Sequence, residues 1–309
     1  MSRRATLPLG VDVGAARTRV AQAELDARGR PVLVAVASRA TGDDAAAALA
    51  GARAELRTRE RRCVLAIAPP DAAVRSVVLP AMGTRERTRA ARFEALRFVD
   101  MPPADAAVRV VRERGDGCIV GVARRTVLDR LVAVARRAGL RPLAVDDAAL
   151  ALLRAYPDAG AIVDVGTRAT LLVVPREPVP LARVVGDGGD ALSSALAASL
   201  GIDAAAAEAR KRSIGMGGAA EHASAAMIDA IASALVAHRA ATATDVRSVV
   251  LTGNGARLAG FAAALERAIA IPVAAGVLDG AAATAYPPDV VRAASPDWAL
   301  AVGLALWAA

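Results

Sequence analysis

The sequence predicts an α/β protein built from two lobes. Its 309 residues are about twice the length of an average domain. A short apolar run with an aspartate two positions before a glycine occurs at residues 10–14 and again at residues 163–166. Because this repeat distance is too long for a solenoid, the pattern indicates two lobes of like construction.

The first half opens with three β-like runs, expected as strands at residues 9–13, 17–25 and 31–37. The glycines between these runs favour hairpins. An alanine-rich helix is expected at residues 43–56. The continuously apolar run at residues 63–68 predicts a strand that is buried on both faces.

The next block, near residues 72–124, has short β-like runs around a single helix-like run, and this pattern predicts a compact insert. Its strands are expected at residues 74–79, 108–112 and 118–123, and its single helix at residues 84–99. Gly115 and Gly117 mark the turn of the last hairpin. The predicted order within the insert is therefore strand–helix–strand–strand.

Helices and strands alternate after the insert. An amphipathic helix is expected at residues 127–138, then a strand at residues 142–145 and a helix that Asp146 caps. In the second half, strands are expected at residues 161–166, 170–174 and 248–252. Helices are expected at residues 190–200, 203–212, 219–240 and 258–270. Residues 276–294 are expected to be irregular, and a last helix is expected to begin at residues 295–297.

The composition argues against several classes of function. Aromatic residues make up only 2 % of the chain, which disfavours stacking platforms for bases or sugars. The net charge of +8 comes from scattered arginines and the single lysine Lys211, which argues against a nucleic-acid footprint. Cys63 and Cys118 lie in apolar runs and are expected to be buried and reduced. Since no uncharged apolar run is long enough to cross a bilayer, the protein is expected to be cytoplasmic.

Three glycine-marked turns follow buried strands, at Gly14, at Gly166 and at residues 253–255. Glycine lets main-chain amides approach a ligand closely, and successive amides in a tight turn form an anion site. Asp12 and Asp164 precede the first two turns. Two carboxylates that face one gap repel each other unless a cation lies between them, so the pair predicts Mg²⁺ together with phosphate.

Other catalytic signatures do not occur in the sequence. Lys211 follows Arg210 rather than a glycine, which excludes a Walker loop. Leu258 stands where a dinucleotide fingerprint needs its third glycine. His222 and His238 have no metal-ligand neighbours and are expected to be structural or solvated.

On these motifs the sequence resembles the actin-like ATPase superfamily and, within it, the PilM family of type IV pilus assembly proteins. The two phosphate hairpins and the adenosine turn of the superfamily correspond to residues 11–14, 163–167 and 251–258. The short segments that resemble PilM-family sequences in particular lie at residues 79–82, 138–142, 145–146, 188–190, 271–273 and 301–306. The resemblance covers nearly the whole chain.

The resemblance implies a two-lobed actin-like (ribonuclease H-like) fold with ATP and Mg²⁺ in the cleft. It implies a first lobe at residues 1–160 that carries the insert near 72–124. The second lobe would span residues 161–309, with a nucleotide-base subdomain near 190–243. The last helix, at residues 296–308, could return to the first lobe.

The resemblance also implies the binding residues. The implied metal ligands are Asp12 and Asp164. The residues implied to bind the nucleotide are Gly14, Ala15, Arg19, Gly166, Thr167, Gly188, Gly189, Glu208, Lys211, Arg212, Gly253, Asn254, Gly255 and Arg257.

The implied function is that of a cytoplasmic scaffold in a type IV pilus or a related secretion platform. The scaffold would bind the N-terminal cytoplasmic peptide of a PilN-like inner-membrane protein, in a groove between the insert and the first lobe. Through this partner alone the protein would be peripheral to the inner membrane. Nucleotide would close the lobes and thereby bias the groove. No nucleic acid is expected as a partner, and an oligomer is compatible with the fold.

The first hairpin departs from the PilM pattern. Ala15 and Ala16 stand where that family has hydroxyl residues, and Arg19 stands where it has a lysine, so two side-chain donors to phosphate are missing. Ala148 replaces an acid that is frequent in the family, and Asp147 is expected in the first turn of a helix instead. Because no evident base could activate water, ATP hydrolysis is expected to be slow or absent.

The helix of the insert is basic where the PilM family tends to be acidic. Its basic residues are Arg85, Arg87, Arg89, Arg92 and Arg97. Two interpretations remain open at this point. The arginines could form a solvated face, or they could contact an acidic partner or anionic lipid.

Three alternative functions also remain open. The first is a filament-forming division protein of the FtsA kind, which would need a C-terminal amphipathic membrane helix. Residues 298–307 are instead apolar on all sides, which favours a helix buried in the core. A pseudo-ATPase scaffold without nucleotide is compatible with Ala15 and Ala16. A small-molecule kinase on the same fold would need a substrate-facing acid near residues 146–148.

Overall fold

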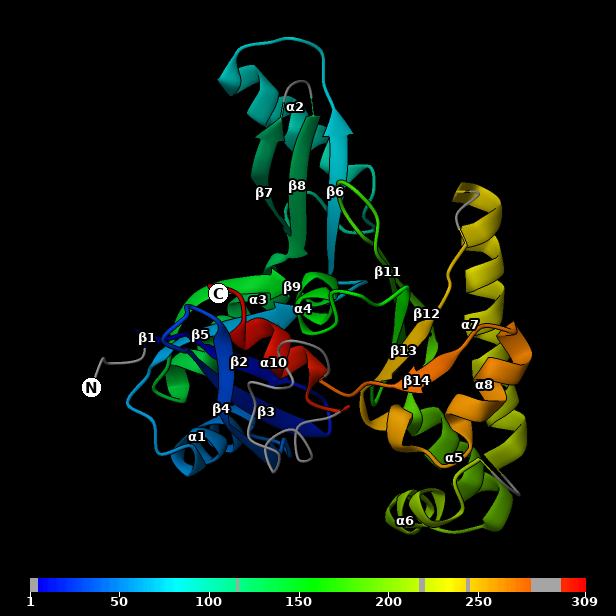
Figure 1. Cartoon of the computed structure of the whole chain (residues 1–309). Coiled ribbons are helices and arrows are strands. Elements are labelled where there is room, and N and C mark those ends of the chain that lie inside the picture. Colours follow the sequence, from blue (N-terminus) through cyan, green and yellow to red (C-terminus); the bar gives the residue numbers. More distant parts are fainter. Residues whose placement is uncertain (1–4, 115–116, 217–219, 243–244, 279–295) are drawn as a thin grey trace.

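The chain forms two large mixed sheets that carry helices, and a small third sheet that projects from the first lobe (Figure 1). The structure is a computed structural model that describes residues 5–114, 117–216, 220–242, 245–278 and 296–309. Within these ranges no helix is both long enough and apolar enough to cross a membrane.

The first sheet has the strand order β1–β3–β2–β5–β9, and β4 pairs with β3. Its strands are β1 (Ala5–Thr6), β2 (Leu9–Val13), β3 (Arg17–Leu25), β4 (Pro31–Ala40), β5 (Arg62–Ile67) and β9 (Arg141–Asp147). β2 and β3 form the expected antiparallel hairpin, whereas β2, β5 and β9 run parallel. The helices α1 (Ala45–Glu55) and α3 (Arg125–Arg137) cover one face, where Leu49 and Leu131 pack with Val11 and Leu65.

The second sheet repeats this topology in the order β12–β11–β10–β13–β14. Its strands are β10 (Ala161–Val165), β11 (Ala169–Val174), β12 (Leu181–Asp187), β13 (Val249–Thr252) and β14 (Val273–Ala275). β10 is antiparallel to β11 and parallel to β13, so β10 takes the place that β2 has in the first sheet. The internal repeat of the sequence is therefore a repeat of topology. Sequence patterns do not predict β12, because most of this edge strand is half-buried or exposed.

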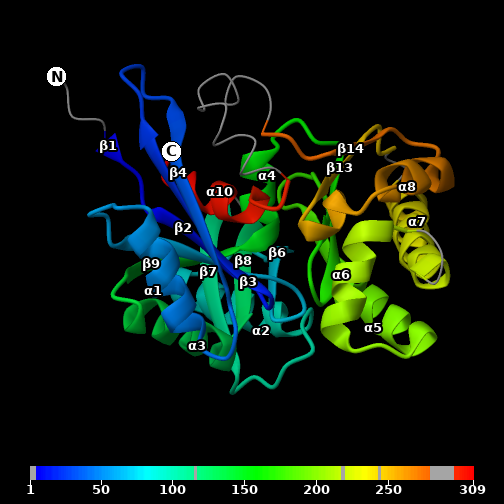
Figure 2. The same cartoon turned by 90° about the horizontal axis from the view of Figure 1, so that it is seen from below.

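The helices of the second lobe lie mainly on the side away from the first lobe (Figure 2). They are α5 (Gly189–Leu200), α6 (Ala204–Ile214), α7 (Glu221–Thr242) and α8 (Phe261–Ile269), with the short 3₁₀ helix η2 (Asn254–Arg257) after β13. α7 and α8 pack on the second sheet through Ile231, Leu235, Phe261 and Leu265.

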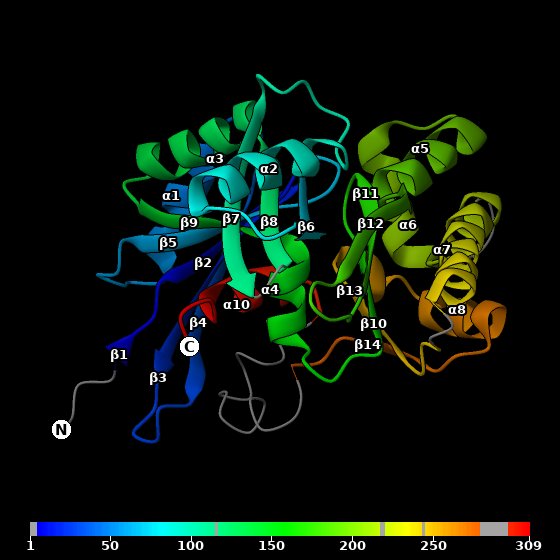
Figure 3. The same ribbon diagram turned by 90° about the horizontal axis from the view of Figure 1, so that it is seen from above.

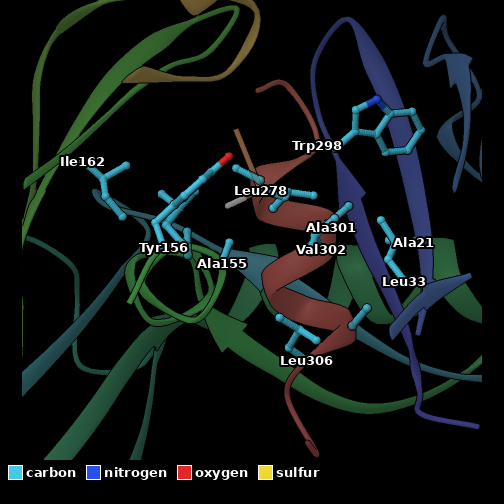
Figure 4. Packing of buried hydrophobic residues seen from close by; sticks show 14 of the residues in the cluster. Ala21, Leu33, Ala155, Tyr156, Ile162, Leu278, Trp298, Ala301, Val302 and Leu306 are labelled. Atoms are coloured by element: carbon cyan, nitrogen blue, oxygen red, sulfur yellow. The ribbon is translucent and has the colours of Figure 1, made fainter. Parts of the chain in front are cut away.

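A shared apolar cluster joins the two lobes (Figure 4). It is centred on α4 (Ala148–Ala155) and α10 (Ala299–Ala305), and it reaches Leu33 of the first sheet and Ile162 of the second. α10 packs on β2 and β3 as well as on α4, so the end of the chain is built into the first lobe. Gly10 and Gly303 permit this packing, because a Cβ at either position would overlap main-chain atoms of the facing element.

The insert has the predicted strand–helix–strand–strand order. It comprises β6 (Ala72–Val78), α2 (Thr84–Leu96), β7 (Ala106–Arg114) and β8 (Gly117–Arg124), with the sheet order β6–β8–β7. α2 covers one face of this sheet (Figure 3), where Ala91 and Ala95 pack with Cys118 and Val120. Cys118 and Cys63 are buried free thiols, as predicted.

Several helix starts differ from the predicted ones. Asp147, not Asp146, caps α4, because its Oδ1 accepts from the amides of Ala149 at 2.9 Å and Leu150 at 3.4 Å. α5 begins after Gly188 rather than at an Asp190 cap. α10 begins at Ala299 instead of at residues 295–297. The segment predicted to be irregular, residues 276–294, lies outside the described residues from position 279 onward.

Candidate functional site between the two sheets

The first glycine turn closes the β2–β3 hairpin. The amide of Gly14 donates to the Arg17 carbonyl at 3.1 Å, and a Cβ on Gly14 would lie 2.7 Å from that oxygen. The Thr41 hydroxyl donates to the Gly14 carbonyl at 2.7 Å and holds the turn from the side. Asp12 and Arg19 are cross-strand partners in this hairpin, so the strand register brings a carboxylate and a guanidinium together.

The second glycine turn closes the equivalent β10–β11 hairpin. The Gly166 amide donates to the Ala169 carbonyl at 3.0 Å. The N-terminus of α5 rests on this turn, because the amides of Gly189 and Asp190 donate to the carbonyls of Gly166 and Thr167, both at 2.9 Å. A Cβ on Gly188 would lie within 2.6 Å of three main-chain atoms of the turn, so only glycine allows this approach.

The third glycine turn packs on the end of β10. Gly253 has a φ of +76°, and a Cβ there would meet the Val165 carbonyl and would lie 2.9 Å from Asp164 Oδ1. A Cβ on Gly255 would overlap the Val165 side chain. Thr252, the last residue of β13, donates its hydroxyl to Asp164 Oδ1 at 2.8 Å. The two turns of the second lobe therefore meet at Asp164.

Arg19 connects this arrangement across the lobes. Its Nη1 lies 3.6 Å from Asp12 Oδ2, and its Nη2 donates to Asn254 Oδ1 at 3.0 Å. Nη2 also contacts Asp297 Oδ2 at 3.3 Å, and Arg257 reaches the other oxygen of Asp297 at 3.3 Å. The Arg19 side chain is nearly buried, yet its Nε has no hydrogen-bond partner among the described residues. A buried donor without a partner is costly, so this nitrogen is a candidate ligand contact.

The pKa values of both aspartates are raised. Burial raises the pKa of Asp12 from 3.8 to about 6, even though Arg19 opposes the shift, and the negative charge of Asp164 raises it further. Burial also raises the pKa of Asp164, and the Thr252 hydrogen bond and Arg19 counteract this shift. The two carboxyl groups thus interact across the lobes, and one arginine does not compensate both.

This pKa shift predicts a pH dependence of stability. Between about pH 4 and 6 the folded state holds a proton on Asp12 that the unfolded chain has released, so the stability contributed by Asp12 falls as pH rises through this window. We expect Asp12→Asn to become more stable than the unmodified protein above pH 6, by about 3 kcal/mol at most. Urea unfolding at pH 4.5 and pH 7.0 without nucleotide measures this difference.

Asp129→Asn serves as the matched control, because Asp129 is an exposed carboxylate on α3. The stability difference between this variant and the unmodified protein should stay constant from pH 4.5 to pH 7.0. An Asp12→Asn difference that is equally constant would contradict the burial of a charged Asp12.

The α5–α6 network lies beside the second glycine turn. Lys211 Nζ donates to the Gly189 carbonyl and to Ser193 Oγ, both at 2.9 Å, and it pairs with Glu208 at 2.6 Å. Ser193 Oγ also bonds to Glu208 at 2.7 Å. Arg212 pairs with Glu208 at 2.9 Å and is largely exposed. The only lysine of the chain therefore holds the start of α5 against α6.

The acids at the end of β9 are already engaged. Asp147 caps α4, and burial raises its pKa to about 6. Asp146 pairs with Arg154. Neither acid is placed as a base without giving up its structural partner, which agrees with the expectation from sequence that Asp147 belongs to a helix start. His238 is buried on α7 beside Thr242, as expected for a structural histidine.

Hydrogen bonds and close packing link several of the residues that were predicted from sequence. Arg19 joins the first hairpin to Asn254, and the turn containing Asn254 packs on the strand of Asp164. Gly188, Gly189 and Lys211 adjoin the second hairpin. Ala15 is exposed on the first turn, while Arg257 is exposed at the rim.

Sequence reasoning missed Asp297 and Thr252. Asp297 follows a proline at an apparent helix start, so its pattern indicated a first-turn acid rather than a partner of two arginines. Thr252 ends an apolar strand directly before the glycine turn, and a polar residue at this position could have been predicted as part of the site. Within the described ranges no three histidine, cysteine or acidic side chains converge as a metal cluster. A cation bound here would therefore need additional ligands from water or phosphate.

Comparisons with known proteins agree with the fold and the motifs. The family model described as type IV pilus assembly protein PilM matches residues 115–309. The solved structure of a PilM–PilN type IV pilus biogenesis complex contains a chain that superposes with a TM-score of 0.83 at 25 % identity, covering 97 % of both chains.

Two more distant structures show the fold alone. The ethanolamine utilization protein EutJ from Carboxydothermus hydrogenoformans has a TM-score of 0.56 at 19 % identity and covers 97 % of this chain and 89 % of its own. A MamK double helical filament has a TM-score of 0.56 at 14 % identity and covers 98 % of both chains. A search of curated protein sequences found no match. With its actin-like fold and the family match over residues 115–309, the chain belongs to the PilM family of type IV pilus assembly proteins.

Proposed function

We propose that this PilM-family protein binds ATP with Mg²⁺ between its two lobes and acts as a scaffold of a type IV pilus or related secretion platform. It holds the N-terminal cytoplasmic peptide of a PilN-like inner-membrane protein and is attached to the inner membrane through it. In this proposal the lobes are residues 1–160 and 161–309, with the insert at 72–124 and a nucleotide-base subdomain at 190–243.

The observation that carries the nucleotide proposal is that two half-buried carboxyl groups, one from each hairpin, lie close enough to interact electrostatically. Asp12 and Asp164 each have a raised pKa, because each carboxylate loses solvation on burial and its hydrogen bonds and Arg19 do not fully offset that loss. A divalent cation supplies that compensation. Mg²⁺ is commonly held by one or two carboxylates, with water and phosphate oxygens as the remaining ligands, which fits a site with only two acids.

The anion half of the site would consist of the glycine turns and Arg19. The glycines of the two tight turns place no side chain in the way of a phosphate, and α5 begins directly at the second turn. The amides of Gly14, Gly166, Gly189 and Asp190 already donate within the protein, so a phosphate would bind to other amides of these turns. Arg19 Nε has no hydrogen-bond partner in the part of the chain that the structure describes, and it would donate a charge-assisted bond to a phosphate oxygen.

The base and ribose would lie between η2 and α6. In this proposal residues 253–255 and Arg257 line one side, and Glu208, Lys211 and Arg212 line the other. Lys211 already bonds to the Gly189 carbonyl, so it would also position the start of α5 below the phosphates. ATP would be held with slow or no turnover, because Asp146 and Asp147 are engaged elsewhere.

The partner proposal follows from the PilM–PilN structure and from this chain's own surface. β9 and β6 are edge strands of the first sheet and of the insert, and they contact each other. Leu143 of β9 is 50 % exposed and Val78 of β6 is 77 % exposed. Edge strands with exposed apolar side chains suit an extended peptide, which pairs through its main chain and fills side-chain positions.

A nucleotide-free scaffold is the second candidate. Arg19 already bridges Asp12, Asn254 and Asp297 within the protein, so the two lobes have a link that needs no ligand. Ala15 and Ala16 also offer no hydroxyl to a phosphate.

Thermal unfolding with ATP–Mg²⁺ distinguishes the two candidates. At a ligand concentration of 100 times Kd, binding to the folded state adds roughly 2.7 kcal/mol, which raises Tm by several degrees. ATP with EDTA in place of Mg²⁺ should give a smaller gain. No gain with ATP–Mg²⁺ would favour the nucleotide-free scaffold.

Peptide affinity tests the coupling between the two sites. We expect the N-terminal peptide of the PilN-like partner, labelled with a fluorophore, to bind several-fold more tightly with ATP–Mg²⁺ than without it, because a ligand that bridges two lobes favours the closed state. Fluorescence anisotropy measures both affinities. Equal affinities would remove the coupling, and no binding in either state would contradict the partner.

A further inference from the structure

We propose that the outward face of α2, at the projecting insert, binds the surface of an anionic membrane. This inference does not depend on the nucleotide site. We define the outward face as Arg85, Arg89, Arg92 and Phe93. These residues recur at helical spacing on the side of α2 opposite to the buried Ala91 and Ala95.

The first observation is an unusual exposure of phenylalanine. The chain has only three phenylalanines, and Phe261 is fully buried in the second lobe. Phe93 is 69 % exposed on α2, and Phe98, just after the helix, is 48 % exposed. In a protein with so few aromatic residues, two exposed ones at a single projecting element indicate a surface that meets an apolar environment.

The second observation is the charge that surrounds Phe93. Arg85, Arg89 and Arg92 are exposed, and none of them makes a hydrogen bond or ion pair with a described residue. The acids of α2 are Glu86, which is exposed on the same side, and Glu94, which pairs with Arg97 at 3.0 Å. The outward face is therefore mainly cationic, with an aromatic side chain at its C-terminal end.

The shape of the insert favours a membrane over an acidic protein as the partner. The insert projects from the body (Figure 1), and α2 lies on its surface (Figure 3). A convex cationic helix can rest on a flat lipid surface, where phosphates attract the arginines and Phe93 enters the headgroup region. An acidic protein partner would need an apolar pocket beside its acids to accept Phe93, whereas a lipid surface offers negative charge and an apolar interior together.

Vesicle co-sedimentation tests the proposal on the full-length protein. We expect binding to vesicles of phosphatidylcholine with phosphatidylglycerol, and much weaker binding to phosphatidylcholine alone. Binding should weaken as NaCl shortens the range of the attraction. The charge reversal R85E/R89E/R92E should lower partitioning by at least about a hundredfold, since each basic residue near an anionic surface contributes about fivefold and the new glutamates are repelled.

Three variants serve as controls. R130E/R136E/R267E changes the net charge equally at exposed arginines elsewhere and should keep most of the binding. R85K/R89K/R92K keeps the charge of the outward face and should also bind. Phe93→Ala should bind several-fold more weakly at every salt concentration, because it removes only the apolar contribution. Circular dichroism checks that all variants are folded.

Several results would overturn the proposal. One is equal binding of the unmodified protein to neutral and anionic vesicles, or no binding to either. Another is an equal loss in the two charge-reversal variants, which would indicate a general charge effect. A third is binding to polyglutamate but not to vesicles, which would assign the outward face to an acidic protein.

Discussion

Replacing Gly303 with alanine is expected to lower the free energy of unfolding by about 3 kcal/mol or more. The new Cβ would overlap the carbonyl group of Ala151 in α4. Because the clashing atoms belong to the main chain of a buried helix, no side-chain rotation can relieve the overlap, and α10 must move away from α4. That movement would open the apolar cluster that joins both lobes. Urea unfolding of the purified protein measures the loss.

Gly51→Ala is the matched control, with an effect of the opposite sign. Gly51 also lies inside a helix, α1, but the nearest atom to its Cβ would be 3.6 Å away, which is an ordinary contact. Alanine has the higher helix propensity, so this variant should gain about 0.5–1 kcal/mol. A Gly303→Ala variant as stable as the unmodified protein would show that α10 does not pack on α4 in this way.

Asp164→Asn is expected to keep or raise the stability of the nucleotide-free protein and to abolish the rise in Tm with ATP–Mg²⁺. The asparagine can still accept the hydrogen bond from Thr252, but it removes the charge of a half-buried carboxyl group whose pKa is raised. The nucleotide-free variant should therefore be as stable as the unmodified protein at pH 7, or more stable. The gain in Tm with ATP–Mg²⁺ should disappear, because the cation loses one of its two carboxylate ligands.

Asp12→Asn should behave in the same way, since both aspartates contribute to one cation site in the proposal. Asp158→Ala is the control, because it removes an exposed carboxylate from the turn before β10 and should leave the response to ATP–Mg²⁺ unchanged. If both asparagine variants keep the full ATP–Mg²⁺ gain, the two aspartates do not hold the cation. Isothermal titration calorimetry then gives the affinities directly.

The local sequence was a good guide to the strands and turns around the site. Asp12 and Asp164 each precede a glycine in an apolar strand, and these motifs predicted two equivalent hairpins that the fold indeed contains. The helix of the insert was also predicted, from Ala90, Phe93 and Leu96 at helical spacing, although the helix buries Ala91 and Ala95 and leaves Phe93 exposed. Predictions of this kind succeed where one strand or helix carries its own pattern of burial.

Helix starts and the edge strand were predicted less well. Asp146 and Asp147 are both able to cap a helix, and only the course of β9 decides that Asp147 does so. β12 has no clear alternation, because it lies at the edge of the second sheet. At such places the local sequence permits several structures of similar free energy, and tertiary contacts choose among them.

The sequence by itself determined the two-lobed α/β architecture, the repeated hairpins and the chemistry available at their turns, because strand periodicity and glycine conformations are properties of neighbouring residues. The tertiary structure alone decided that Arg19 reaches Asn254 and Asp297, residues more than 230 positions away in the chain. The return of the last helix to the first lobe was implied by the family resemblance, but only the structure shows that α10 packs on β2 and β3, where Gly10 and Gly303 allow main chains to touch. Such contacts join segments far apart in the chain, and no local sequence pattern in either segment predicts the other. They therefore form only when both lobes have folded and packed against each other.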